Sequence, residues 1–317
     1  MRIGALKAKK ATTSVLVYAS RYLALLCFSY ALLYPFVYMG INSVKNPTDW
    51  FDPTVTWVPK HFNVDNFVVA IKYMDYFRTF WYTFINCIIP ALLSFFTCAV
   101  AGYGLARFKF KGRSVLNTIM IICIMIPDPL IMIPSYGNFM HLDFLGIFGL
   151  INRLTGFDLR VSILNTPLVF IIPALLAVGL KNGLFIYIYS QFFKGLPKEL
   201  EEAAWIDGAG PYKTFLKIVL PSSGASNITV LVFATVWYCN DYYQAQMYLS
   251  SKFPMSVVLS NFNSNLTLLN DFAEKYNYTT ATLLLTCCLV AIAPILIFFL
   301  IMQRKFVQSI ATCGIVG

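Results

Sequence analysis

The sequence predicts an all-α, polytopic membrane protein with six transmembrane helices. Three observations support this prediction: the composition, the number of long apolar segments, and an uneven distribution of Lys and Arg. The chain has 317 residues, of which 58% are hydrophobic and 12% are charged, and its mean hydropathy is +0.68. A soluble domain carries about 25% charged residues, so a bilayer accommodates this composition better than one soluble core does.

Six apolar segments are each long enough to cross the membrane, because about 30 Å of hydrocarbon takes about 20 helical residues. The expected spans are residues 22–41, 79–105, 115–136, 164–193, 223–247 and 279–302. Pro173, Gly179, Lys181 and Gly183 interrupt the fourth span, which indicates two helical pieces. Helices are expected because a span must satisfy its backbone hydrogen bonds internally and the alternating pattern of a barrel is missing.

Lys and Arg in the connections predict the orientation. One side of the membrane takes 15 of them and the other side takes 8. The richer side comprises residues 1–21, 106–114, 194–222 and 303–317; the poorer side comprises residues 42–78, 137–163 and 248–278. The richer side is expected to be cytoplasmic. We therefore expect a cytoplasmic N-terminal segment at 1–21, a permease domain at 22–302 that begins with an uncleaved span, and a cytoplasmic tail at 303–317.

Several function classes are disfavoured by the residue pattern. The net charge of +10 does not indicate nucleic-acid binding, because the basic residues lie between apolar stretches and no basic run is interleaved with aromatic residues. The 8 Cys form no CxxC pair and are interpreted as buried apolar residues. His61 and His141 fall in predicted outer connections and are interpreted as incidental. No GxxxxGK[ST] phosphate loop occurs, so we expect no catalytic or metal site and no ATPase in this chain.

The fourth connection, residues 194–221, reads KGLPKELEEAAWIDGAGPYKTFLKIVLP. Pro197 can occupy the first turn of a helix, and the three Glu residues that follow suit the positive end of its dipole. Gly208 can end this helix in a left-handed conformation. Pro211 is expected to begin a second short helix, and Pro221 is expected to end it. The sequence therefore predicts a helix–turn–helix at the cytoplasmic surface, which we call the coupling segment.

The first helix of the coupling segment is predicted to offer a shallow face to another surface. Leu200, Ala203, Ala204 and Asp207 are spaced to share one face. Two adjacent alanines on that face would allow a close approach. The motif that follows decides which kind of surface is expected.

Glu202-Ala203-Ala204, then three residues, Gly208, nine residues and Ile218-Val219-Leu220-Pro221 reproduce the EAA motif of ABC importer permeases. The chain resembles carbohydrate-uptake permeases related to the smaller membrane subunit of the maltose transporter. The resemblance implies the type I ABC importer permease fold. Nine residues are expected to couple the chain to an ATPase: Glu202, Ala203, Ala204, Asp207, Gly208, Ala209, Ile218, Leu220 and Pro221.

The resemblance also implies the partners and the compartment. They are a cytoplasmic ABC ATPase dimer that binds ATP and Mg, a second, unlike permease subunit, an extracytoplasmic sugar-binding protein and membrane lipid. The chain itself is expected to bind no cofactor and no nucleic acid. Its expected location is the bacterial inner or plasma membrane, with both termini in the cytoplasm.

A polar and aromatic group in the fifth predicted span is a candidate lining of the translocation path. Trp237, Asn240, Asp241 and Tyr242 resemble a cluster that the family carries in this span. The candidate path residues are Trp237, Asn240, Asp241, Tyr243, Gln244 and, in the third span, Asp128. Aromatic faces and polar side chains suit a sugar. The alternative is an interfacial aromatic belt or helix packing without a ligand.

Two questions stay open at the level of sequence. Lys181 lies inside a span, where it could snorkel to the interface or pair across a subunit boundary. The substrate could be a non-sugar solute, because ABC permeases of several kinds share the EAA motif. A secondary transporter is a further alternative, but its coupling-ion site and internal repeat are not visible.

Overall fold

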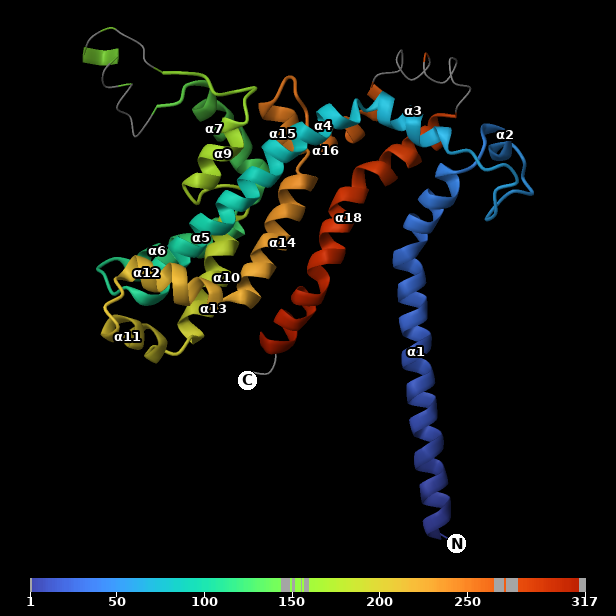
Figure 1. Ribbon diagram of the computed structural model, residues 1–317, viewed down its shortest axis with the longest axis horizontal. Helices are drawn as coiled ribbons and strands as arrows, with labels where there is room; N and C mark the ends of the chain where they lie inside the picture. Colours follow the sequence, from blue (N-terminus) through green and yellow to red (C-terminus); the bar gives the residue numbers. More distant parts are fainter. Residues whose placement is uncertain are drawn as a thin grey trace. The chain divides into compact units, whose positions relative to one another are not determined.

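The computed structural model describes residues 2–143, 149, 152–154, 156, 160–264, 271 and 279–313. The chain divides into two compact units. Unit 1 comprises residues 1–73 and 265–292, and unit 2 comprises residues 74–264 and 293–317. Helices dominate both units, as the sequence predicts (Figure 1). Within the described ranges the extended pairings are two isolated bridges, one joining Lys45 to Phe62 and one joining Leu142 to Val161.

Unit 1 is built on one long helix. Its helices are α1 (Arg2–Ser43), α2 (Pro47–Trp50), α3 (Asp65–Tyr73) and the first part of α18 (Thr280–Cys313). The apolar side chains of α1 between residues 16 and 38 are largely exposed within the chain. Such a surface fits contact with lipid or with another membrane chain.

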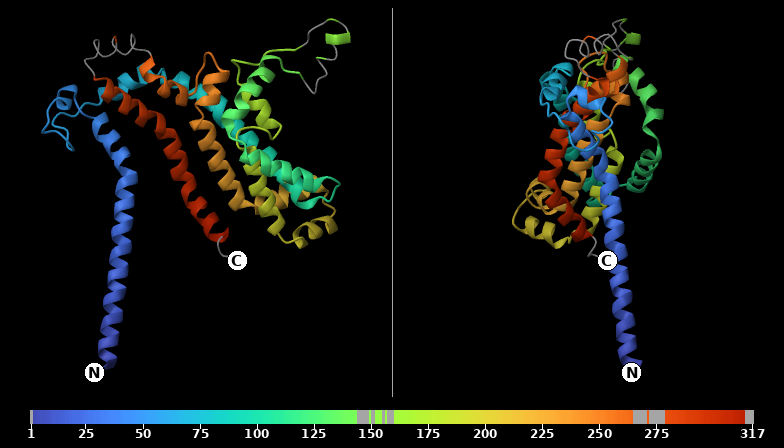
Figure 2. Two further views of the ribbon diagram at one scale, coloured as in Figure 1. Left: turned by 180° about the vertical axis from the view of Figure 1, so that it is seen from behind. Right: turned by 90° about the vertical axis from the view of Figure 1, so that its right-hand side faces the viewer.

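Unit 2 contains the regions predicted to carry function. Its elements are α4 (Tyr76–Thr83), the π-helix η1 (Phe84–Ile88), α5 (Ile89–Arg107), α6 (Arg113–Met125), α7 (Asp128–Met140), α9 (Leu168–Leu175), α10 (Asn182–Gly195), α11 (Glu199–Ile206), α12 (Pro211–Thr214), the π-helix η2 (Phe215–Val219), α13 (Leu220–Ser222), α14 (Gly224–Asn240), α15 (Tyr243–Tyr248), α16 (Met255–Ser260), the short 3₁₀ helix η3 (Phe262–Ser264) and the rest of α18. α11–α13 lie at one end of this unit, and α7, α9 and α15 lie at the other (Figure 1, Figure 2).

The core of unit 2 lies where α5 packs along α10. A Cβ atom placed on Gly102 of α5 would lie 2.6 Å from Cβ of Tyr189, so the absence of a side chain at residue 102 lets the two helices approach closely. Phe185, Tyr189 and Phe193 line the α10 side of this contact and are fully buried. The close approach of small and aromatic residues fixes the C-terminal end of α5 beside the start of the coupling segment.

Among the described residues, helix length and apolarity identify fewer candidate spans than the predicted six. Three described helices are long and apolar enough to cross a membrane: Leu16–Ser43, Tyr76–Arg107 and Thr280–Val307. Two bent pairs raise the number to five if each is one span; α6 with α7 is bent by 105°, and Pro211–Ser222 with α14 is bent by 81°. The predicted number of six is therefore not confirmed.

The fourth and sixth predicted spans show why helix length and sequence pattern disagree. The fourth span consists of α9 with 8 residues and α10 with 14, and left-handed Ala177 and Lys181 lie between them. The predicted division into two helical pieces is confirmed, but neither piece spans a bilayer alone. α18 continues to Cys313, so the predicted tail at 303–317 begins as helix in its described part.

Candidate coupling segment and translocation path

The turn of the coupling segment follows from one glycine. Gly208 has a φ of +76°, as predicted for a left-handed helix end. Its N–H donates to the carbonyl of Trp205 at 3.0 Å, and the N–H of Ala209 donates to the carbonyl of Ala204 at 2.9 Å. These two bonds form a Schellman motif, which satisfies carbonyl groups at the end of α11 and turns the chain toward α12.

The second helix of the coupling segment begins at Pro211, as predicted, and ends at Ser222, one residue after the predicted Pro221. α12, η2 and α13 continue one another from Pro211 to Ser222. The π-helical turn η2 precedes Pro221, which then lies in the first turn of α13, where a missing N–H is tolerated. Ile218 and Leu220 are half-buried, and Leu220 packs against the core of unit 2.

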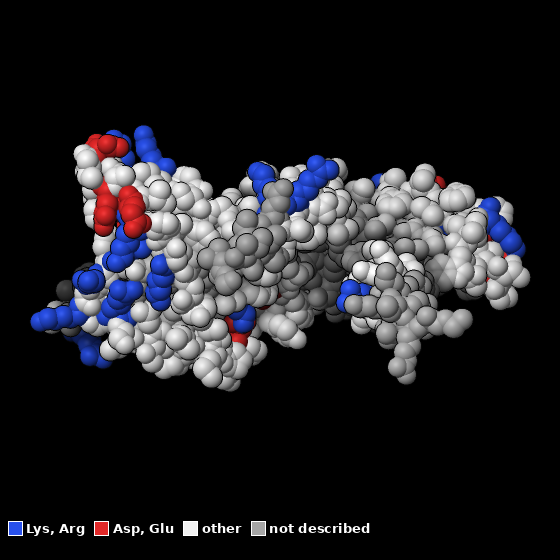
Figure 3. All heavy atoms as spheres, turned by 90° about the horizontal axis from the view of Figure 1, so that it is seen from below, with Lys and Arg blue, Asp and Glu red and all other residues white. Residues whose placement is uncertain are grey.

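α11 has an inner face that packs on its own chain and an outer face that is open. Glu201 and Ala204 are 5% and 4% exposed, whereas Glu202, Ala203 and Asp207 are exposed. Of the predicted common face, Leu200, Ala203 and Asp207 are exposed, whereas Ala204 is buried; the prediction is wrong for Ala204. Charged side chains gather over α11 and the loops beside it at the left of Figure 3.

A buried ion pair that sequence reasoning missed holds the inner face. Oε1 of Glu201 lies 2.6 Å from Nε of Arg107, at the end of α5, without the alignment of a hydrogen bond. Nη2 of Arg107 donates to the carbonyl of Leu196 at 2.7 Å, and the Tyr103 hydroxyl donates to Oε2 of Glu201 at 3.3 Å. Two features of the sequence are consistent with this ion pair: Arg107 follows the end of a predicted span, and three Glu residues lie in the coupling segment. The EAA motif, however, indicates Glu202 as the functional carboxylate.

Trp237, the first candidate path residue, lies within aromatic packing. Its ring centroid is 5.6 Å from that of Phe185 in α10 and 5.5 Å from that of Phe233 one turn earlier in α14. The indole is half-buried against the core of unit 2. This position ties α14 to α10.

The other candidates of the fifth span lie at the break between α14 and α15. Asn240 and Tyr243 are exposed within the chain, and Gln244 is half-buried. A carboxylate oxygen of Asp241 accepts the N–H of Gln244 at 3.3 Å, and the Asp241 carbonyl accepts the Ser256 hydroxyl at 2.8 Å. The break thus keeps Asp241 bound to its surroundings and leaves an amide and a phenol facing out of the chain.

Asp128 and Lys181, whose roles the sequence leaves open, form an ion pair within unit 2. Oδ2 of Asp128 lies 2.7 Å from Nζ of Lys181, and about a third of each side chain is exposed, 34% and 33% respectively. Asp128 is the first residue of α7, directly after the bend between α6 and α7. Lys181 directly precedes α10 and has a left-handed backbone conformation. The pair joins two of the helical breaks in this unit.

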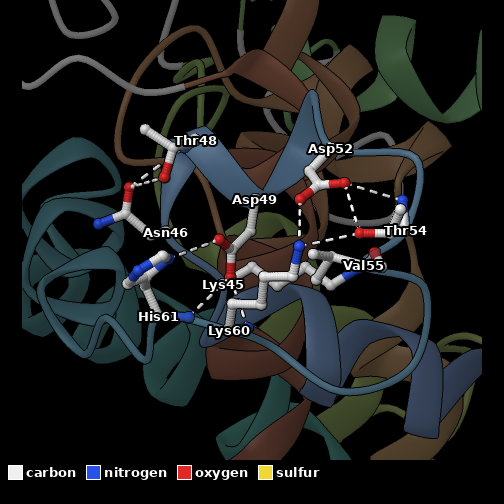
Figure 4. Close-up of polar contacts among 9 residues, drawn as sticks. All are labelled: Lys45, Asn46, Thr48, Asp49, Asp52, Thr54, Val55, Lys60 and His61. Carbon is white, nitrogen blue, oxygen red and sulfur yellow. Dashed lines mark hydrogen bonds and ion pairs between the residues drawn. The ribbon is translucent and has the colours of Figure 1, made fainter.

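Unit 1 holds a second buried carboxylate, in the loop between α1 and α3. Asp49 is 3% exposed and accepts the backbone N–H groups of Lys60 and His61, each at 2.9 Å. Nδ1 of His61 lies 2.9 Å from its other oxygen (Figure 4). Lys45 Nζ donates to the carbonyls of residues 55 and 56. His61 is therefore not incidental, because it braces the loop; a contact between residues 12 apart leaves no sequence pattern.

The comparisons with known proteins agree with the motif. Residues 98–312 match the family described as the binding-protein-dependent transport system inner membrane component. The chain belongs to this family. The permease is thus a membrane component of a binding-protein-dependent transport system, and the matched residues include the whole coupling segment and all candidate path residues.

Individual relatives extend the match over most of the permease. It is 26% identical over 276 residues to the probable starch degradation products transport system permease protein AmyC of Thermoanaerobacterium thermosulfurigenes, covering 87% of this chain and 89% of the relative. It is 26% identical to the arabinooligosaccharides transport system permease protein AraQ of Halalkalibacterium halodurans, covering 91% and 93%. It is 25% identical to the lactose transport system permease protein LacG of Rhizobium radiobacter, covering 91% and 93%.

A solved structure shows that the fold is shared. A chain of a bacterial ABC transporter involved in the import of the acidic polysaccharide alginate matches with a TM-score of 0.69 and 19% identity. The match covers 92% of the permease and 96% of that chain. The predicted importer permease fold is thereby confirmed.

Proposed function

We propose that the permease forms half of the translocation path of an ATP-driven importer for a sugar or oligosaccharide. A separate cytoplasmic ATPase dimer binds ATP and Mg, and the coupling segment docks on it. The observation that carries this proposal is the two-faced α11. Its inner face is fixed to the permease by Glu201 and Ala204, while Glu202, Ala203 and Ile206, which is 87% exposed, face outward.

The named substrates of the relatives support the sugar assignment. AmyC, AraQ and LacG carry the names of starch degradation products, arabinooligosaccharides and lactose, respectively. The exposed Asn240 and Tyr243 offer an amide and an aromatic ring, which is the chemistry that sugars bind. The exposed apolar surface of α1 is available to lipid or to the second, unlike permease subunit. An extracytoplasmic binding protein delivers the sugar.

Purification and uptake together test this function. The permease, extracted from its native membrane in mild detergent, is expected to bring an ABC ATPase and a second permease with it. Cells that lack the permease are expected to lose uptake of at least one of labelled maltotriose, arabinotriose and lactose. Purification without an ATPase would contradict the importer, and intact uptake of all three sugars with lost uptake of a peptide would contradict the sugar class.

The orientation is part of the same proposal and rests on the 15-to-8 distribution of Lys and Arg. A membrane-impermeant thiol reagent should label Asn63→Cys in sealed cells and should not label Lys213→Cys. The unsubstituted permease sets the background from its own cysteines. Labelling of Lys213→Cys from outside would reverse the proposed orientation.

A further inference from the structure

We infer that Arg107 and Glu201 are positioning residues for coupling: their buried ion pair is the joint through which movement of α11 reaches the transmembrane helix α5. This inference rests on the proposed function, because it assumes that a partner moves α11. It assigns a role to two residues outside the EAA motif itself. Neither side chain touches the outer face, so both act through the position of the helix.

Burial is the first step of the argument. The side chains of Arg107 and Glu201 are only 8% and 6% exposed. A buried ion pair requires good geometry to offset the desolvation of two charges, and apolar residues of similar size are often as stable or more so. Stability alone therefore gives no reason to place charges here. An attachment of α11 to the end of α5 does give one.

The position of the pair is the second step. Arg107 is the last residue of α5, and it also holds the Leu196 carbonyl at the end of α10. Tyr103, one turn earlier in α5, donates to Glu201 and lies with its ring 5.0 Å from that of Phe215 in η2. The connection that leads into α11 and the helix that leads out of it are thus both held to α5 at one point.

The packing below the pair is the third step. Tyr103 also packs against Phe193 of α10 at 5.8 Å, and Phe193 is fully buried. α5 and α10 approach each other closely through Gly102. A displacement of Glu201 therefore cannot be absorbed by a loose side chain and is passed to two packed helices. The outer face of α11 would receive the force, and the inner face would transmit it.

Two variants test the inference in the complete importer with its ATPase. The double variant Arg107→Met with Glu201→Leu removes both charges together, so neither charge is left buried without the other; the Leu196 carbonyl and the Tyr103 hydroxyl each lose one hydrogen-bond partner. Glu201→Gln keeps the shape and removes one charge. Glu199→Gln is the matched control, because Glu199 is exposed on the same helix. The two readouts in proteoliposomes are ATPase co-purification and the ratio of hydrolysis with loaded binding protein to hydrolysis without it.

We expect the double variant to retain the ATPase while this ratio falls about tenfold, a change typical of coupling between sites. Glu201→Gln should lower it less, and Glu199→Gln should not lower it. A normal ratio in the double variant would overturn the inference and leave the proposed function intact. Loss of the ATPase in both variants would also overturn it, by assigning the pair to folding. Failure of the wild-type importer to bind an ATPase would instead contradict the proposed function.

Discussion

Two regions of unit 2 differ in how deeply their charged side chains are buried. At the coupling segment, Arg107 and Glu201 are almost fully buried and meet each other inside the chain. Farther from the coupling segment, a third of Asp128 and of Lys181 remains exposed, and Asn240 faces out of the chain. Ionisable residues in membrane spans face a cavity, a partner or the interface. The comparison separates a region whose charges are paired inside the chain from one whose polar groups remain open to their surroundings.

The largest expected effect is the loss of stability when one partner of the buried Arg107–Glu201 ion pair is removed. Arg107→Met should destabilise the permease by about 3–5 kcal/mol, because it leaves the Glu201 carboxylate buried without its cation. The free energy of unfolding in detergent measures this effect. Lys109→Met is the control, since Lys109 is exposed two residues further along the chain. Equal stability of the two variants would show that the Arg107–Glu201 ion pair contributes nothing to the free energy of unfolding.

The half-exposed pair should respond more weakly. Lys181→Met should change the free energy of unfolding by about 1 kcal/mol or less, because a third of each side chain in this ion pair is exposed. The same unfolding measurement applies. A loss of stability as large as that of Arg107→Met would mean that the two ion pairs contribute equally to stability despite their different burial.

Substitutions at Asn240 and Asp241 should instead affect transport. Asn240→Leu should reduce sugar uptake roughly two- to tenfold, which corresponds to the loss of one hydrogen bond to the substrate. Asp241→Leu should also reduce uptake, because it removes the carboxylate that accepts the N–H of Gln244 at the break between α14 and α15. The importer should remain assembled, because both residues lie at the end of α14 that is farther from the coupling segment. Uptake in cells and co-purification of the ATPase are measured together. Normal uptake in both variants would remove these residues from the path.

The smallest expected effect concerns the loop of unit 1, where the Asp49 carboxylate is held by backbone N–H groups and His61. His61 and the surrounding N–H groups lower the pKa of Asp49 below its ordinary value of 3.8. The charged form is therefore favoured in the folded loop. Its stabilising effect is complete above pH 3.8 and is lost as the pH falls through the lower folded pKa.

Hydrogen exchange of residues 44–64 tests this pH dependence. After correction for intrinsic rates, protection should be lower in strong acid than at neutral pH. Asp49→Asn should reduce this difference but not abolish it, because Lys60 and Thr54 also lower the pKa of Asp52 in the same loop. Asp52→Asn should leave the contribution of Asp49 in place. Protection that rises with acid in the unsubstituted permease would contradict the sign of the shift.

The sequence predicted those features that depend on local pattern. Gly208 adopts the left-handed conformation, Pro211 begins a helix, and the fourth span is divided between α9 and α10. Each of these follows from the allowed backbone angles of one or two residues or from interrupted hydropathy. The EAA motif also predicted the family, which the match over residues 98–312 shows.

Features that depend on tertiary packing were not predictable in the same way. The rotation of α11, which turns Ala204 inward, follows from the contact between Glu201 and Arg107, residues 94 positions apart. The partner of Lys181 is Asp128 in another helix, and periodicity within either helix does not reveal it.

The most direct test of the central claim concerns the outer side of the coupling segment. Gly208→Val places a β-branched residue at a φ of +76°, which should cost about 1 kcal/mol or more and misdirect α12. Ala203→Asp places a charge on the exposed face of α11, where docking would desolvate it. Both variants should insert normally, because both residues lie outside the apolar segments.

Co-purification of the ATPase, together with substrate-stimulated hydrolysis in proteoliposomes, is the measurement. The account predicts that each variant gives a stable permease that either loses the ATPase or retains it without stimulation by the loaded binding protein. If both variants bind the ATPase and transport normally, the coupling segment does not couple the permease to its ATPase, and the proposed function is contradicted.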